Sequence, residues 1–164
     1  MLKLEVKSRG GFVLRRAIPG DCEMIADDMR SFDVAEVWAA SKSSPIEAVE
    51  KGFRSSAPFL WTGAWSGTPV FMGGCVSLDI VGGVGTPWLL GTEKIRECPI
   101  QFARMTKEIV FYLASQYQFL FNYVDARNLT SIRWLKFLGF TIHEARPYGA
   151  LGLPFHRFEM RGRG

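Results

Sequence analysis

The stretch from Phe119 to Phe140 constrains the fold of this chain more than any other. It begins with FLFNYV, a run of aromatic and β-branched residues that is typical of a strand. The residues at 125–128, DARN, are typical of a turn. Apolar residues then recur at helical spacing, and Gly139 is placed to end the helix in a left-handed conformation. The stretch therefore predicts a strand, a short loop, a helix and a sharp stop before the next strand.

Four residues of this stretch, Asn128, Ser131, Gly139 and Phe140, form the spacing N-x-x-S-x-x-x-x-x-x-x-G-F. With this spacing the sequence resembles the GNAT superfamily of acyl-CoA N-acyltransferases. In that family the asparagine opens the last helix beside the pantetheine of CoA, and the Gly-Phe pair closes the helix. The segment LRRAIPGDCEMIA near the amino terminus is similar to the opening of the same family.

The order of expected strands and helices fits this family along essentially the whole chain. The resemblance implies one GNAT-like domain over residues 1–164 with an α/β (α+β) fold. Its mixed central sheet is expected to have about six to seven strands, flanked by about four to five helices. A fold of this kind hosts many activities, so the site residues must decide the function.

Three segments, 29–41, 87–92 and 121–140, resemble more closely the GNAT-like proteins of short-tailed bacteriophages. Those proteins include acetyltransferases and internal virion proteins. The resemblance implies a protein of the host cytoplasm, and also of the virion interior. Its expected partners are an acyl-CoA with an amine acceptor, or a host or virion protein. The oligomeric state stays open.

Composition limits the remaining function classes. No apolar run approaches the roughly 18 residues that cross a bilayer, and MLKLEVKSRGG lacks the apolar core of a signal peptide, so we expect no membrane association. Three separated cysteines give no disulfide framework, and we expect reduced, mostly buried thiols. His143 and His156 are the only histidines, and their spacing does not predict a metal site.

The positive charge gathers at the carboxyl end. Residues 127–164 carry seven Lys and Arg side chains against two acidic ones. This surplus suits CoA phosphates, an acidic protein surface or a nucleic acid, and it is also compatible with an ordinary solvated surface. We expect no nucleic-acid partner.

Capping and turn residues predict the other elements. A strand is expected at 12–17, followed by a helix with Asp21 as N-cap. Ser44 and Glu47 have the spacing of a capping box, and a helix is also expected from Pro99. Gly73-Gly74 indicates a bulge or a close backbone approach in a strand. Two closing strands are expected at 141–144 and 155–160, with a turn-rich segment at 146–154 between them.

The loop that cradles the CoA pyrophosphate in GNAT enzymes has the pattern Gln/Arg-x-x-Gly-x-Gly/Ala. Residues 96–101, RECPIQ, occupy its place. Arg96 matches the pattern, but Pro99 donates no N–H, and Gln101 brings a side chain where the backbone approaches the phosphates. Side chains of Arg96, Thr92 or Arg104 are the alternative phosphate contacts.

The resemblance to this family implies a cofactor, acetyl-CoA, with no metal. Asn128 has the strongest claim to bind it, although helix capping alone also explains this residue. The full set of expected cofactor-binding residues comprises Leu89, Leu90, Arg96, Gln101, Arg104, Asn128 and Ser131.

Amine acylation needs a base for the amine proton and an acid for the leaving thiolate. Candidates for the base are Glu36, Asp79 and Glu93, and we expect Glu93 because it lies just past the strand at 86–90. A leucine, Leu135, stands where many GNAT enzymes have the acid tyrosine. Tyr148 is our candidate for the acid, and Tyr123 is the alternative.

Two hypotheses follow from the sequence. The first is an acetyl-CoA-dependent N-acetyltransferase encoded by a phage, which acts on an amine of a protein or small molecule. The second is a phage protein with the same fold and no catalysis, which binds a host target or serves as an internal virion component. The altered positions Pro99, Gln101 and Leu135 favour the second hypothesis.

Overall fold

The computed structural model of the protein describes residues 7–163. Residues 1–6, part of the segment that we read as lacking a signal-peptide core, lie outside this range. None of the described helices is long and apolar enough to cross a membrane. The described elements are β1 (Lys7–Arg9), β2 (Phe12–Arg16), α1 (Asp21–Asp27), α2 (Ser31–Ser41), α3 (Pro45–Ser55), β3 (Leu60–Trp65), β4 (Thr68–Asp79), β5 (Val84–Gly91), the 3-10 helix η1 (Glu93–Glu97), α4 (Pro99–Gln116), β6 (Phe119–Asp125), α5 (Leu129–Leu138), β7 (Thr141–Tyr148) and β8 (Leu153–Arg161).

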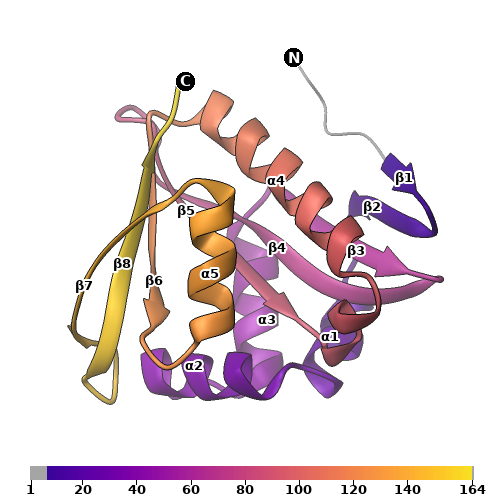
Figure 1. Ribbon diagram of the computed structural model, residues 1–164, viewed down its shortest axis with the longest axis horizontal. Coiled ribbons are helices and arrows are strands. Elements are labelled where there is room, and N and C mark those ends of the chain that lie inside the picture. The colour runs from indigo at the N-terminus through magenta and orange to yellow at the C-terminus, as the bar shows by residue number, and fades with distance from the viewer. Residues whose placement is uncertain (1–6, 164) are drawn as a thin grey trace.

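One mixed sheet runs through the described residues in the order β1-β2-β3-β4-β5-β6-β8-β7. Neighbouring strands are antiparallel except β5 and β6, which are parallel. In Figure 1, α4 and α5 lie in front of the sheet and α3 lies behind it. The expected α/β class with a mixed central sheet is confirmed. The sheet has eight strands in residues 7–163, because the short β1 pairs with β2 beyond the strands that we expected.

Two apolar clusters hold the helices on the sheet. The larger lies between the sheet and the α4 and α5 helices, and includes Phe71, Met105 and Leu120. The smaller packs α1 and α3 on the other face, around Met72 of β4. Burial of apolar side chains on both faces explains why the central strands β3 and β4 have nearly continuous buried runs.

Several local expectations are confirmed. Ser44 and Glu47 form a capping box at the start of α3. Gly139 ends α5 with a φ of 101°, in the left-handed region. A Cβ atom at Gly74 would meet the carbonyl oxygen of Phe59, so this glycine marks a close backbone approach between β4 and the start of β3.

The two closing strands are longer than the sequence predicted. β7 extends from Thr141 to Tyr148, so Arg146-Pro147-Tyr148 is strand and the turn is confined to residues 149–152. Pro147 is compatible with the strand because β7 is an edge of the sheet, where the proline removes no ladder hydrogen bond.

The expected N-cap of α1 also differs. Asp21 is the first helical residue, and Gly20 holds the cap position. The Asp21 carboxylate instead accepts hydrogen bonds from both terminal nitrogens of Arg15 at 2.8 Å, and from the hydroxyl of Thr62 at 2.8 Å. It therefore ties α1 to β2 and β3.

Replacing Asp21 with asparagine should lower the free energy of unfolding by about 2 kcal/mol, because Arg15 loses its charged partner. Burial alone would raise the pKa of Asp21, but the bonds from Arg15, Ile18 and Thr62 outweigh it and hold that pKa below its ordinary value. The wild-type advantage is therefore present at neutral pH and is lost as the pH falls through that lowered pKa. Urea unfolding at several pH values measures it. Asp27→Asn, on the exposed side of the same helix, is the matched control, and an equal loss in both variants would contradict this account.

Candidate functional site

The central feature of the site is a cleft between the parallel strands β5 and β6. The two strands pair only at Val84 with Phe119 and at Gly85 with Leu120, and then diverge. Pro87 lies just past the last pair and has no N–H to offer β6. It remains in β5 because its missing donor faces the cleft and not the ladder with β4.

The register of β5 decides which backbone groups face this cleft. Thr92 donates its N–H to the carbonyl of Val70 on β4. In an antiparallel ladder alternate residues pair in this way, so Leu90 also turns its backbone toward β4. Pro87, Leu89 and Gly91 therefore present their backbone groups to the cleft.

Asn122 bridges the narrow end of the cleft. Its Nδ2 donates to the carbonyl of Pro87 on β5 at 2.9 Å, and its Oδ1 accepts the N–H of Tyr123 at 2.8 Å. One side chain thus satisfies a backbone group on each strand where the ladder has ended.

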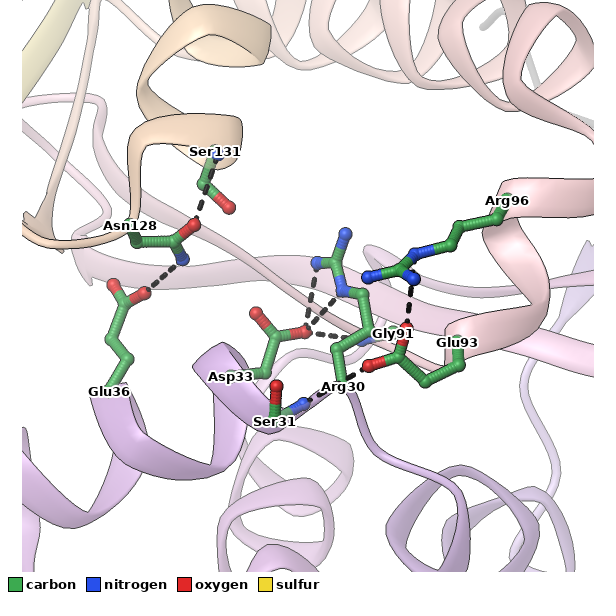
Figure 2. A network of polar contacts seen from close by, with 9 residues as sticks. All are labelled: Arg30, Ser31, Asp33, Glu36, Gly91, Glu93, Arg96, Asn128 and Ser131. Carbon is green, nitrogen blue, oxygen red and sulfur yellow. Dashed lines mark hydrogen bonds and ion pairs between the residues drawn. The ribbon is translucent and has the colours of Figure 1, made fainter.

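At the wide end, Asp33 of α2 and Arg30, the N-cap of α2, satisfy the backbone N–H and carbonyl of Gly91. The Asp33 carboxylate accepts the Gly91 N–H at 3.0 Å and the Arg30 guanidinium at 2.9 Å. The backbone N–H of Arg30 donates to the Gly91 carbonyl. Figure 2 shows this buried ion pair against the end of β5. With Pro87 and Gly91 satisfied, Leu89 is the position of β5 whose backbone is left to meet a ligand in the cleft.

The cleft joins two cavities on opposite faces of the sheet. The α4–α5 cavity, of about 60 Å³, is apolar, and the α2–α3 cavity on the other face has about 410 Å³. Six residues of the cleft line both cavities, so the two cavities adjoin at the cleft. These shared residues are Pro87, Trp88, Leu89, Trp134, Leu135 and Phe158.

Glu36 of α2 points into the α2–α3 cavity beside the start of α5. Its Oε1 accepts the N–H of Asp125 at 3.1 Å, and its Oε2 accepts Nδ2 of Asn128 at 2.8 Å (Figure 2). Burial raises the pKa of Glu36 to about 7, although these two hydrogen bonds act against the rise. A carboxylate with such a pKa exchanges protons near neutral pH.

Asn128 has two roles in this arrangement. It is the N-cap of α5, where its Oδ1 accepts the N–H of Ser131 at 3.1 Å. Its amide then holds Glu36 with the opposite end. The capping role that the sequence left open is therefore real, and it also orients a titratable group. Ser131 lines the α2–α3 cavity.

Glu93 lies away from this group. It begins η1, forms an ion pair with Arg96 at 3.2 Å and accepts the N–H of Ser31 at 3.4 Å (Figure 2). Neither Glu93 nor Arg96 lines the two cavities described above. The catalytic role of Glu93 and the phosphate-binding role of Arg96 stay predictions.

The expected phosphate cradle is the first turn of α4. Pro99 is the first helical residue, and no side chain caps this end of the helix. Gln101 lies in the same turn, and Arg104 is exposed one turn further on. The backbone donors of Ile100 and Gln101 are thus at a helix N-terminus, a favourable place for an anion.

Tyr148 and Tyr123 stack with ring centroids 3.9 Å apart and line the α2–α3 cavity together. Burial, and then the neighbouring Tyr123, raise the pKa of Tyr148. The two candidate acids therefore lie side by side, at the cavity that also holds Glu36. Leu135 has only 5% of its side chain exposed and belongs to the core.

The sequence interpretation ranked one residue of the site too low to choose it and missed another. Glu36 was a candidate base behind Glu93, because nothing in the α2 sequence shows that its neighbours on β6 and α5 shield it from solvent. Asn122 had a visible signal, since it is an amide in the middle of the apolar strand FLFNYV. A polar side chain at such a position needs a buried partner.

The three cysteines are all free thiols. Cys22, Cys75 and Cys98 are free and buried, as expected. Burial raises the pKa of Cys75 to about 12 and that of Cys98 to about 11. Among residues 7–163, His, Cys, Asp and Glu side chains form no group of three that could hold a metal ion.

No protein-family model and no curated protein match the sequence. Solved structures do match. Spermidine N-acetyltransferase from Vibrio cholerae, in complex with CoA and spermine, has a TM-score of 0.70 at 11% identity over 94% of this chain and 97% of its own. A GNAT-family acetyltransferase from Streptococcus pneumoniae has a TM-score of 0.64 at 11% identity, over 93% of this chain and 99% of its own. RimL, an acetyltransferase of a ribosomal protein solved with CoA, has a TM-score of 0.67 at 10% identity, over 96% of this chain and 98% of its own. The chain therefore has the fold of the GNAT acetyltransferases, as the sequence resemblance implies.

The partly buried carboxyl of Glu36 should make the free energy of unfolding depend on pH. Because burial raises its pKa to about 7, the folded protein keeps a proton that the unfolded chain has lost. Stability should therefore fall as the pH rises from about 5 to 8, by about 2 to 3 kcal/mol from this group. Glu36→Gln should remove that slope, and urea unfolding across this range measures it. Glu23→Gln, at an exposed position of α1, should keep the wild-type slope. An unchanged slope in Glu36→Gln would show that this carboxyl titrates normally.

Proposed function

We propose that the protein transfers the acetyl group of acetyl-CoA to a primary amine. The observation that carries this proposal is the cleft between β5 and β6, which has a free backbone position at Leu89 and a titratable Glu36 on one side. The fold supports it, because the matching structures include enzymes solved with CoA.

The residues present fit an acyl-CoA in the cleft. The backbone of Leu89 suits an amide or thioester, which pairs with a strand as a neighbouring strand does. The uncapped first turn of α4 suits the pyrophosphate, with Arg96 and Arg104 as side-chain donors. Pro99 removes one N–H from this turn, so these side chains carry more of the phosphate contact than a glycine loop requires. When bound, the cofactor supplies the activated acyl group.

The acceptor amine approaches through the α2–α3 cavity. A protonated amine is not nucleophilic, and Glu36, with a pKa of about 7, is suited to remove its proton. Asn128 and the Asp125 N–H fix the carboxylate in place. Tyr148 is the candidate acid for the leaving thiolate, since it lines the same cavity. Glu93 is the alternative base.

The setting in which the reaction takes place is also part of the proposal. The resemblance of residues 29–41, 87–92 and 121–140 to phage proteins favours a bacteriophage protein that acts in the host cytoplasm on an amine of a protein or small molecule. A second candidate is a binding protein without catalysis, placed in the host or the virion. It is favoured by Pro99 at the start of α4 and by the side chains that occupy most cleft-facing backbone groups.

Titration calorimetry of acetyl-CoA and CoA tests the cofactor site. We expect saturable binding with a Kd of about 1 μM, near −8 kcal/mol. Asn128→Ala should weaken it about tenfold, because the start of α5 and the orientation of Glu36 both change. Ser44→Ala removes a helix cap at α3 outside the cleft and should bind as the wild type does. Absence of heat at millimolar ligand would reject the enzyme and favour the binding protein.

Thiol release from acetyl-CoA with a panel of polyamines, amino acids and peptides tests the base. Glu36→Gln should lower kcat/KM about 100-fold, because the amine proton has lost its acceptor. Glu93→Gln should change kcat/KM less than about threefold, because Glu93 is placed on η1 beside Arg96. The reverse ranking would assign the base to Glu93 and contradict the role of Glu36.

A further inference from the structure

We propose that Asn122 sets the length of the acyl group that the cleft accepts, and limits it to acetyl. The inference rests on the proposed function and adds a specificity-determining residue to it. Asn122 stands out in the sequence as an amide within an apolar strand. Its bridge to Pro87 is the contact that closes the cleft.

The direction of the acyl chain follows from the strand order. The first turn of α4 comes after the carboxyl end of β5, through η1, so the anionic end of a CoA lies toward the wide end of the cleft. A ligand that runs down β5 from there passes Gly91 and reaches Leu89. The acyl tail beyond the thioester then points toward Pro87 and the narrow end.

At the narrow end the Asn122 bridge crosses the gap between the two strands in the path of that tail. Pro87 lies two residues from Leu89, about 7 Å along the strand. There the Asn122 side chain spans from β6 to the Pro87 carbonyl, with heavy atoms 2.9 Å apart. The second bond, from the Tyr123 N–H to Asn122 Oδ1 at 2.8 Å, prevents the side chain from swinging aside. Both bonds are partly shielded from water, so breaking them to admit a longer chain is unfavourable.

The two buried or partly buried carboxylates around the cleft leave this end free. Asp33 and Glu36 satisfy the backbone at Gly91 and Asp125, which are the last residues of β5 and β6. They border the wide end, where the ligand enters. Asn122 is therefore the polar side chain that meets the acyl terminus, and shortening it should extend the cleft toward the Gly85–Leu120 pair.

Calorimetric titration with CoA, acetyl-CoA, butyryl-CoA and hexanoyl-CoA tests this inference without an acceptor. The wild type should bind acetyl-CoA at least about tenfold more tightly than hexanoyl-CoA. In Asn122→Ala that ratio should fall below about threefold, because the narrow end opens while the affinity for free CoA stays the same. Asn122→Ser serves in the same way where the alanine variant fails to fold.

The control is Ser77→Ala. Ser77 bonds the Tyr117 hydroxyl at 2.6 Å beside the closed end of the strands, outside the two cavities. This variant loses a hydrogen bond of similar kind and should keep the wild-type discrimination. Equal binding of acetyl-CoA and hexanoyl-CoA by the wild type would overturn the inference, as would full discrimination in both Asn122 variants. A wild type that binds neither CoA nor acetyl-CoA would instead overturn the proposed function, and this inference with it.

Discussion

The separation of β5 from β6 is the constraint on which the rest of the site depends. A strand that leaves its neighbour inside a protein exposes N–H and C=O groups that need other partners. Here an amide, Asn122, and two carboxylates, Asp33 and Glu36, take up those groups at successive places. The position of α2 follows from this, because Asp33 and Glu36 of this helix reach the open strands, and Asn128 at the start of α5 holds Glu36 in place. Different side chains thus satisfy the unpaired backbone groups of the cleft one at a time, and Leu89 is the position left open to a ligand.

Burial and neighbouring charges shift the pKa of each carboxyl group by different balances. Burial raises the pKa of Asp33 even though Arg30 pairs with it. Burial would also raise the pKa of Asp125, but the hydrogen bonds from Arg127 outweigh it and hold that pKa below its ordinary value. Glu36 is held by neutral donors, the Asn128 amide and the Asp125 N–H. Without a neighbouring positive charge in direct contact, burial dominates, and the pKa of Glu36 rises to about 7. Groups with such an environment in a cavity are characteristic of functional sites.

The order of strands and helices was predictable because it depends on local patterns. The capping box at Ser44, the stop at Gly139 and the helix start at Pro99 are set by residues within a few positions of each other. The site was less predictable, because Glu36 meets Asn128 only after the chain folds back from α2 to α5. Position along the chain, just past β5, favoured Glu93 as the base, and that role stays a prediction. The turn residues of 146–148 misled us, since an edge strand tolerates proline and β7 continues through it.

The cleft has a kinetic consequence for the proposed reaction. The acyl carrier runs down β5 from the wide end, and the acceptor comes through the α2–α3 cavity, so the two ligands approach the cleft along different directions. In a transferase built this way, neither reactant blocks the arrival of the other, and the acylated product leaves while the spent carrier is still bound. Burial raises the pKa of Cys98 to about 11 and that of Cys75 to about 12, so neither offers a thiolate that would carry the acyl group as a covalent intermediate. Such an architecture favours a ternary complex with either order of binding over a shuttle through a covalent enzyme form.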